Sequence, residues 1–449
     1  MGYAGLLFSL WNLIKNEFKT EEQIHKIQKK KLKKLLNYAY NNSVYYRREF
    51  ERAGITGNNI NSVPFSSFPL MDKEQLMANF NEVVTDKRIK QEELARFDKG
   101  NNKEKLFKGE FHIVHSSGST GTPRYFVYDS KAWEHMLTGI TRGAFWGMGI
   151  MEILKLLKSM PKVLYIAATD GRYGGAMAVG DGIRGLKIPQ LFLDINTPIS
   201  KWKEIVQNFA PDIIIGYPSA VKMLAEEINN GRKQVSAKRV ISCGEPLAPG
   251  LRSFLENTFQ CPVINFYGAS ESLALGAGKS ADDGMYLFDD MNIVEIINGE
   301  MYITCLYNYV QPLIRYHISD KIKPREKSLN PICSFTNVDV LLCRNEDVMW
   351  FMKEDSTKEF IHPLSVEGMC IDGLLDYQFV QTSRQGFKVL AEIKNTVSKV
   401  KLKKELKSRL DMILQEKDLE HVLYEISFVK SIKPDASTGK KRLIVIKET

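Results

Sequence analysis

A loop that could cradle phosphate groups spans residues 116–123 and reads Ser-Ser-Gly-Ser-Thr-Gly-Thr-Pro. Its two glycines let the backbone wrap closely around an anion, and its hydroxyl and backbone N–H groups can donate hydrogen bonds to phosphate oxygens. A Walker A loop requires Gly, four residues and then Gly-Lys-Ser or Gly-Lys-Thr, and this loop lacks that pattern. Because such a composition is by itself more often an ordinary surface loop, the interpretation depends on the other segments.

Three further segments carry a stacking surface, an oxygen ligand, a hydrogen-bond acceptor and a cation. In residues 267–271, the tyrosine offers a flat face, the glycine a tight turn, and Glu271 an oxygen ligand suited to Mg²⁺. Asp320 ends the segment 312–320, where a carboxylate can accept hydrogen bonds from two ribose hydroxyls. Lys440 follows a Ser-Thr-Gly sequence, in a loop that could carry a long cation into a site. Each segment also has an ordinary alternative: a core tyrosine, a surface glutamate, a structural Arg–Asp pair or a solvated lysine.

The middle of the chain alternates strand and helix patterns. Short β-rich apolar runs predict strands, and apolar residues at helical spacing predict helices between them. Strands separated by helices pair in parallel through right-handed crossovers, and ligands then bind at the carboxyl ends of the strands. The loops after Cys243 and Phe266 are therefore expected to border a site. The predicted strands are 163–168, 190–193, 212–216, 239–243 and 262–266, and the predicted helices are 202–209, 221–228 and 251–258.

The C-terminal part of the chain predicts a separate α+β unit. Strand patterns at 377–382 and 387–393 flank a turn and predict a hairpin. Leucines line one face of a lysine-rich helix between residues 402 and 414, and strand patterns follow at 422–429 and 443–446. We place the boundary near residues 343–347, which divides the chain into a large domain, 1–343, and a small domain, 344–449.

Composition and charge exclude several classes of protein. The 449 residues include 62 Lys or Arg and 53 Asp or Glu, a formal charge of +9. The length predicts two or three domains, and 44% apolar with 26% charged residues excludes disorder, collagen or coiled coil as the dominant architecture. The sequence has no run of about 18 uncharged apolar residues, so we expect no transmembrane helix. The positive excess suits polyanionic small molecules, and without a nucleic-acid motif we expect no nucleic-acid partner.

The six cysteines predict a reduced, cytoplasmic protein. No pair has the C-x-x-C spacing, the number is too small for a disulfide scaffold, and no secretory signal is apparent. A mixed metal site of Cys243, Cys305 and a histidine stays open, because the sequence does not show which residues cluster in space. Four histidines are interpreted as structural or hydrogen-bonding residues rather than metal ligands: His112, His115, His135 and His317.

Residues 1–18 predict an amphipathic helix, and a run with six lysines follows between Lys26 and Lys34. This combination is typical of attachment to an anionic membrane surface. The alternative is a helix packed on its own protein, with a solvated basic face. We favour the second interpretation, and membrane contact through residues 1–34 stays open as the alternative.

Together, the order and spacing of these segments resemble the adenylate-forming superfamily of acyl-CoA synthetases, above all its phenylacetate–CoA ligase branch, which includes capsular-polysaccharide-associated homologues. The resemblance covers essentially the whole chain. It implies an α/β fold in which a large N-terminal domain of mostly parallel sheets flanked by helices precedes a small mobile α+β domain. The matching segments are the phosphate loop at 116–123, the adenine-flanking segment at 242–246, the Tyr-Gly-x-x-Glu motif at 267–271, the ribose segment at 299–300 and 312–320, and the hinge motif at 344–347.

The chain departs from the family pattern around the hinge. Cys343 stands where the hinge motif usually has glycine, residues 345–347 match imperfectly, and residues 348–360 do not resemble the usual continuation. The second half of the reaction therefore rests on weaker motifs than the first. Arg124 stands where many members of the superfamily have lysine, which keeps the charge.

The resemblance implies ATP-dependent activation of a carboxylic acid to an acyl-adenylate with release of pyrophosphate. Transfer to a thiol, above all that of coenzyme A, then releases AMP. The implied catalytic residues are Lys440, Glu271 and Thr120. Lys440 would bridge the substrate carboxylate and the α-phosphate, with Lys441 as the alternative, and Glu271 would hold Mg²⁺. No general base is needed in the first step, because the attacking carboxylate is already ionised.

The resemblance also implies a nucleotide-binding set. The phosphate loop would hold the β- and γ-phosphates, Tyr267 would stack on adenine, Asp320 would bind the ribose, and Arg344 would contact the ribose or stabilise the closed domains. The full set is Ser116, Ser117, Gly118, Ser119, Thr120, Gly121, Thr122, Gly244, Glu245, Pro246, Tyr267, Gly268, Ala269, Ser270, Asp320 and Arg344.

Several alternatives stay open. The acceptor could instead be a protein or carrier thiol, an amine or hydroxyl of a sugar precursor, or a cofactor that is adenylylated, in surface polysaccharide biosynthesis for example. A third interpretation is a scaffold protein that binds nucleotide but does not catalyse a reaction. The acid is not identified, although residues 167–177 and 216–219 are candidate linings of its pocket. The oligomeric state is open, and a homodimer is one alternative.

Overall fold

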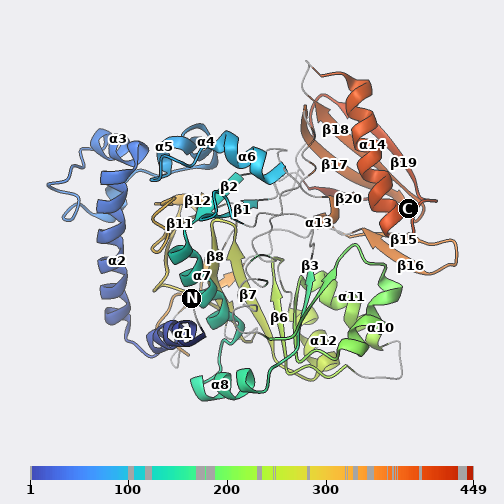
Figure 1. Cartoon of the computed structure of the whole chain (residues 1–449), viewed down its shortest axis with the longest axis horizontal. Helices are drawn as coiled ribbons and strands as arrows, with labels where there is room; N and C mark the ends of the chain where they lie inside the picture. The colour runs from blue at the N-terminus through green and yellow to red at the C-terminus, as the bar shows by residue number, and fades with distance from the viewer. Residues whose placement is uncertain are drawn as a thin grey trace.

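The structure is a computed structural model of the chain. It describes residues 3–99, 106–116, 124–167, 177, 180, 188–229, 235–245, 247, 249–280, 284–318, 320, 322–326, 332–340, 348–361, 363–366, 369, 371, 373–393, 397–432 and 442–447. Figure 1 shows a large body of sheets and helices, with the C-terminal elements gathered at one side of it.

A nine-stranded sheet lies at the centre of the large body, in the order β13-β14-β9-β8-β7-β6-β5-β3-β4. Its strands are β3 (Val163–Ala167), β4 (Gln190–Asp194), β5 (Ile213–Gly216), β6 (Arg239–Cys243), β7 (Val263–Ala269), β8 (Ser272–Gly278), β9 (Met285–Leu287), β13 (Ile322–Pro324) and β14 (Asn337–Val340). The five strands from β3 to β7 pair in parallel, which confirms the predicted parallel sheet. The remaining pairs are antiparallel.

The three predicted connecting helices are present as α10 (Ile199–Phe209), α11 (Pro218–Asn229) and α12 (Pro249–Phe259). Each begins two or three residues before the predicted start. Two of them begin on a proline, whose fixed φ and missing N–H suit the first helical position, and an apolar pattern does not reveal that start. Strand β7 extends to Ala269, so Tyr267 lies inside the strand and not in the loop after it.

Helix α7 (Ser130–Ala144) packs closely on the sheet beside β7 and β8, and α8 (Ile150–Lys158) follows it. Two glycines allow this approach. A Cβ on Gly143 would lie 2.4 Å from the ring of Phe266, and one on Gly139 would lie 2.6 Å from the Met291 side chain. The packing of α7 therefore fixes the strand that carries Tyr267.

The N-terminal quarter wraps around the large body as a series of helices (Figure 1). They are α1 (Tyr3–Glu17), α2 (Glu21–Asn42), α3 (Val44–Arg52), the 3-10 helix η1 (Phe65–Ser67), α4 (Lys73–Ala78), α5 (Phe80–Val83) and α6 (Gln91–Lys99). Thr20 and Gln23 form a capping box that starts α2, which explains why the chain turns there. Helix α1 packs on α7 through its buried face, as the favoured interpretation of residues 1–18 expects. None of the helices within the described residues is long and apolar enough to span a bilayer.

Two smaller antiparallel units lie beside the central sheet. Strands β1 (His112–Ser116) and β2 (Arg124–Tyr128) form a hairpin, in which Ser116 pairs with Arg124. Strands β10 (Asn292–Ile297), β11 (Glu300–Cys305) and β12 (Tyr316–Ile318) form a three-stranded sheet. The predicted phosphate loop therefore connects β1 and β2.

The C-terminal elements form the predicted α+β unit. Its four-stranded sheet has the order β19-β18-β17-β20. The elements are β15 (Met349–Met352), β16 (Lys358–Ile361), α13 (Pro363–Val366), β17 (Leu374–Ser383), β18 (Gly386–Ile393), α14 (Lys399–Glu416), β19 (Leu423–Val429) and β20 (Ile444–Ile446). The hairpin of β17 and β18 and the helix α14 match their predicted positions. The predicted boundary at 343–347 falls outside the described residues and stays a prediction.

The hairpin of β15 and β16 joins the C-terminal unit to the large body. Phe360 on β16 meets Trp202 of α10 edge to face, with ring centroids 5.6 Å apart. Glu359 accepts a hydrogen bond from the Ile199 backbone N–H at 2.7 Å. Lys417, just after α14, donates to the Ile195 carbonyl oxygen and lies 3.5 Å from Glu359. Both charged side chains are fully buried, so they form a closed ionic contact where the two parts meet.

Candidate active site

The carboxyl ends of β6 and β7 lie side by side, because the two strands pair in parallel with Cys243 opposite Phe266. This arrangement brings the segment that follows Cys243 next to Tyr267. It is the edge of the sheet at which ligands bind in parallel α/β folds. The structure thus brings together two of the segments that the sequence singled out.

Tyr267 and Asp320 form a direct contact. The tyrosine hydroxyl donates a hydrogen bond to Asp320 Oδ2 at 2.9 Å, although the residues are 53 positions apart. Gly268 is required beside Tyr267, because a Cβ there would lie 2.4 Å from the Leu273 carbonyl oxygen. The hydrogen bond therefore holds the tyrosine ring beside the Asp320 carboxylate, the two groups that the sequence assigned to the base and to the ribose.

Glu271 lies in the turn between β7 and β8, and its side chain is 8% exposed. Its Oε1 lies 3.4 Å from Arg124 Nη1. The Tyr128 hydroxyl holds this turn in place, because it lies within hydrogen-bond distance of the carbonyl oxygens of Ser270, at 3.0 Å, and Glu271, at 3.2 Å. A carboxylate held in this way is the kind of group that suits Mg²⁺, which proteins bind through one or two carboxylates together with water and substrate phosphates.

Arg124 and Tyr316 complete this group, and the sequence did not place either of them in the site. Arg124 Nη1 donates to the Tyr316 hydroxyl at 3.3 Å as well as to Glu271. Burial raises the pKa of Tyr316 to about 12, so its hydroxyl stays protonated near neutral pH. The sequence points to Arg124 only through its position directly after the phosphate loop. Nothing in the sequence distinguishes Tyr316 from the other residues of the segment 312–320.

Lys73 is a third residue that the sequence did not assign. Burial and the positive charge of Arg124 lower its pKa, whereas Glu74 and Asp376 act in the opposite direction. Lys73 begins α4, and Asp376 lies on β17 of the C-terminal unit. The N-terminal helices and the C-terminal unit therefore both reach the neighbourhood of Arg124.

Gly244 and Glu245 follow β6 and lie against the start of α11. Gly244 has φ +81°, and a Cβ there would lie 2.8 Å from the ring of Tyr217, so this position favours glycine. Glu245 accepts hydrogen bonds from the Ser219 backbone N–H at 3.1 Å and from its hydroxyl at 3.0 Å. The adenine-flanking segment is thereby tied to residues 217–219, one of the candidate linings of the acid pocket.

Several predicted site residues lie outside the described residues. They are the loop from Ser117 to Thr122, Pro246, Arg344 and Lys440, together with most of the candidate pocket lining at 168–176. Ser116 is described only through its backbone at the end of β1. Their roles stay predictions.

The histidines have partners within the protein. His112 stacks on Trp133 at 4.2 Å, His317 Nε2 lies 3.1 Å from Glu300, and His115 Nδ1 lies 3.2 Å from Asp98. Burial lowers the pKa of His135 to about 4, which keeps that ring neutral. These contacts agree with the structural interpretation.

A mixed metal site at Cys243 and Cys305 gains no support. Within the described ranges, no group of three or more His, Cys, Asp or Glu is placed to hold a metal ion. Burial raises the pKa of Cys243 to about 12, and it also raises the pKa of Cys305. A thiol must lose its proton to bind zinc, so burial disfavours that role.

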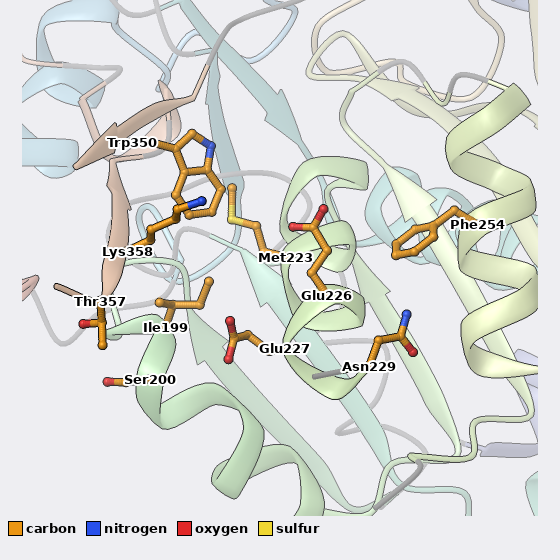
Figure 2. A pocket seen from close by; sticks show the side chains of 10 residues that line it. All are labelled: Ile199, Ser200, Met223, Glu226, Glu227, Asn229, Phe254, Trp350, Thr357 and Lys358. Atoms are coloured by element: carbon orange, nitrogen blue, oxygen red, sulfur yellow. The ribbon is translucent and has the colours of Figure 1, made fainter. Parts of the chain in front are cut away.

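A pocket of about 660 Å³ lies between the β15–β16 hairpin and helices α10, α11 and α12 (Figure 2). Glu226, Glu227 and Asn229 line it from the last turns of α11, whereas the nucleotide segments border the first turn of that helix. Two carboxylates suit a polyphosphate poorly. We therefore assign this pocket to the contact between the two parts of the chain and not to the nucleotide.

Comparison with known proteins first finds a family model that matches the middle of the chain. The family model described as "AMP-binding enzyme" matches residues 177–288, which include β4 to β8 and the turn that carries Glu271. The segments with Gly244, Tyr267 and Glu271 all lie inside this match. The resemblance to the adenylate-forming superfamily is thereby confirmed.

The chain is also similar to individual proteins of two kinds. The chain is 24% identical over 353 residues to phenylacetate-coenzyme A ligase of Aromatoleum evansii, covering 72% of this chain and 73% of that protein. It is 22% identical over 430 residues to the protein CapK of Staphylococcus aureus, covering 94% of this chain and 89% of that protein. These are the two kinds of relative that the sequence motifs indicated.

Solved structures agree with the fold. A structure of 2-hydroxyisobutyryl-CoA ligase with 2-HIB-AMP and CoA in the thioesterification state matches with a TM-score of 0.57 at 18% identity, over 96% of this chain and 91% of that one. An open conformation of the same ligase matches with a TM-score of 0.55 at 18% identity, over 96% of this chain and 93% of that one. The predicted α/β fold class is confirmed.

Proposed function

We propose that this chain activates a carboxylic acid with ATP and transfers the acyl group to the thiol of coenzyme A. The acid would attack the α-phosphate to form an acyl-adenylate and release pyrophosphate, and the thiol would then displace AMP. This proposal rests on two contacts at the carboxyl edge of the sheet. They are the hydrogen bond between Tyr267 and Asp320 and the ion pair between Glu271 and Arg124. The relatives act as supporting evidence, since several are named as CoA ligases.

The main physical difficulty of the first step is charge repulsion, because a carboxylate must approach a polyanion. Asp320 would accept hydrogen bonds from the ribose, and the ring of Tyr267 would cover the base. Arg124 would place a positive charge beside the phosphates. Glu271 would hold Mg²⁺, which supplies further neutralisation of the phosphate oxygens when it is bound.

Lys440 would orient the acid and the α-phosphate for in-line attack. It belongs to the C-terminal part of the chain, so its arrival requires that part to close on the large body, and such closures are common gates. We predict that Lys440→Ala lowers the rate of adenylation by about 10²- to 10³-fold, the range for loss of one electrostatic stabiliser. An effect below about threefold would reject this role and favour Lys441.

The acceptor of the acyl group distinguishes two candidate functions. The departures at residues 343–360 favour a second candidate, an adenylate-forming enzyme whose acceptor is a carrier thiol or a sugar amine or hydroxyl. AMP release that depends on coenzyme A supports the first candidate. Acid-dependent exchange without any response to coenzyme A supports the second.

Carboxylate-dependent exchange of pyrophosphate into ATP tests the shared first step. The protein is assayed with pools of aromatic, aliphatic and amino acids, and Glu271→Gln is the matched inactive control. Exchange with one pool would establish acyl-adenylate formation and name the class of acid. Exchange that is equal in parent and control would contradict the assigned site.

A further inference from the structure

One face of helix α1 is buried against the large body, and the opposite face is exposed to solvent. Leu10, Leu13 and Ile14 are buried against the large body. On the other side, Phe8 is 62% exposed and Phe18 is 81% exposed, although both are large apolar side chains. At 100° per residue Phe8 and Trp11 lie on one side of the helix, and Phe18 follows directly after its last turn. These side chains form an aromatic stripe that the other described residues leave exposed.

Trp11 links this stripe to positive charge. Its ring is 40% exposed and lies beside Phe8, with centroids 6.3 Å apart. Lys15 Nζ lies 3.2 Å from the centre of the Trp11 ring, a cation–π contact on the same outer face. An aromatic ring with an ammonium group beside it is suited to the boundary between lipid headgroups and acyl chains.

The next helix extends the positive charge. Residues 1–43 contain eight lysines and three glutamates, so this tenth of the chain holds more than half of the net charge of +9. In α2, Lys31 points inward and donates to the Asp290 carbonyl oxygen at 2.6 Å. Five other lysines of α2 are exposed: Lys26, Lys29, Lys30, Lys33 and Lys34. Lys26, Lys30 and Lys33 lie opposite the buried Ile24 and Leu35, whereas Lys34 Nζ lies 5.2 Å from the centre of the Tyr309 ring.

We propose that the outer face of α1, with the exposed lysines of α2, attaches this protein to the surface of a bilayer that contains anionic phospholipids. The aromatic side chains would enter the headgroup region, while the lysines would stay above it. A single apolar stripe gives weak attachment, and each lysine near an anionic surface adds about 1 kcal/mol, so the two features together give stable but reversible binding. The charge selects an anionic lipid surface over a neutral partner.

The experiment uses the full chain with sedimenting vesicles. We expect binding to vesicles of phosphatidylcholine and phosphatidylglycerol at 3:1, and at least tenfold weaker binding to phosphatidylcholine alone. Raising the salt from 0.05 to 0.5 M should weaken binding to the anionic vesicles at least tenfold. The triple variant Phe8→Ser, Trp11→Ser, Phe18→Ser should lose at least tenfold in affinity.

Matched controls distinguish binding through α1 and α2 from nonspecific hydrophobic adsorption. Val400→Ser with Leu423→Ser removes two apolar side chains that are 81% and 77% exposed in the C-terminal unit, and it should leave binding unchanged. Trp11 also reports directly, because Trp133, Trp146 and Trp202 are buried and Trp350 is half-buried. Its fluorescence should shift to the blue on anionic vesicles, and Trp11→Phe should bind without that shift.

Three outcomes would overturn the proposal. One is an absence of binding to anionic vesicles by a folded parent protein. Another is binding that the triple variant retains while its circular dichroism matches the parent. The third is evidence that the stripe binds a protein partner. In that case the parent would form an oligomer in light scattering and would not bind vesicles, and the triple variant would be monomeric.

Discussion

The guanidinium of Arg124 lies 3.4 Å from the carboxylate of Glu271. That distance is longer than in a bidentate arginine–carboxylate pair. If Glu271 holds Mg²⁺ as we propose, the carboxylate would exchange this contact for the metal ion. At the scale of single residues, that exchange would distinguish a metal ligand from a structural ion pair.

Glu271→Gln keeps the shape of the side chain and removes its charge. We expect the rate of pyrophosphate exchange to fall about 10²-fold, the size of effect seen when one electrostatic contact to a transition state is lost. The Mg²⁺ concentration for half-maximal rate should rise. Exchange kinetics across a Mg²⁺ titration measure both, and an unchanged Mg²⁺ dependence would reject the ligand role.

Tyr267→Phe removes the hydroxyl that contacts Asp320 and keeps the ring. We expect KM for ATP to rise about threefold to tenfold, with kcat within twofold, because the hydrogen bond orients the carboxylate and the ring still stacks. Steady-state exchange at varied ATP measures the two constants. A fall in kcat with an unchanged KM would show that the tyrosine acts on the reacting atoms instead.

At the scale of elements, α1, α2 and α7 meet around one buried pair. Arg142 of α7 donates to both oxygens of Asp290 at 2.9 Å, and Asn16 donates to Asp290 Oδ2 at 2.7 Å. Glu17, at the end of α1, lies in the same region. Burial raises the pKa of Glu17 to about 7, and Asp290 adds to this while Arg142 opposes it.

This raised pKa predicts how stability depends on pH. Between about pH 4.5 and 7 the folded protein binds the Glu17 proton and the unfolded chain does not, so the contribution of Glu17 to stability is lost as the pH rises. Glu17→Gln mimics the protonated form. We expect the variant to be more stable than the parent at pH 8, by on the order of 2 kcal/mol, and equal to it at pH 4. Denaturant melts at both pH values check this, and an equal gain at both would contradict it.

Local patterns predicted the parallel part of the central sheet, its three connecting helices and most of the C-terminal unit. The run 239–243 became β6 without change, and the leucine spacing of 402–414 became α14, because a buried strand and an amphipathic helix each have a local period. The hairpin of β15 and β16 was not predicted, since its Met-, Trp- and Lys-rich sequence has no clear alternation.

The site was only partly predictable, for a related reason. Motifs in the sequence identified Tyr267, Asp320 and Glu271, but their mutual contacts depend on strands that lie far apart along the chain. Arg124 and Tyr316 meet across 192 positions, so no window of sequence contains both. Sequence spacing therefore predicts which segments carry chemistry, and the sheet order decides which side chains touch.

At the scale of the whole molecule, the two parts of the chain are joined by a buried charge pair. Lys417 contacts the Ile195 carbonyl oxygen and Glu359, and Glu359 receives the Ile199 N–H. Burial lowers the pKa of Lys417 to about 8, so at pH 7 the ammonium group remains charged and needs these partners. Any large movement of the C-terminal unit would have to open this contact.

Removing both partners should therefore cost less than the sum of the two single removals. Lys417→Met and Glu359→Gln should each lower the stability of the folded protein by about 3 kcal/mol, because each leaves a buried group without its partner. The double variant should lose clearly less than the sum of the two. Denaturant melts of the four proteins give this coupling, and additive losses would show that the pair does not act as a unit.

The central claim is a nucleotide site at the carboxyl edge of the sheet, and ATP binding measured by titration calorimetry tests it most directly. The account predicts that the parent protein binds ATP and that Asp320→Ala abolishes or severely weakens this binding. Asp339→Ala, which removes an exposed carboxylate on β14, should bind like the parent. A folded parent protein that does not bind ATP, or an Asp320→Ala variant that binds it as tightly as the parent does, would contradict the assignment of the site.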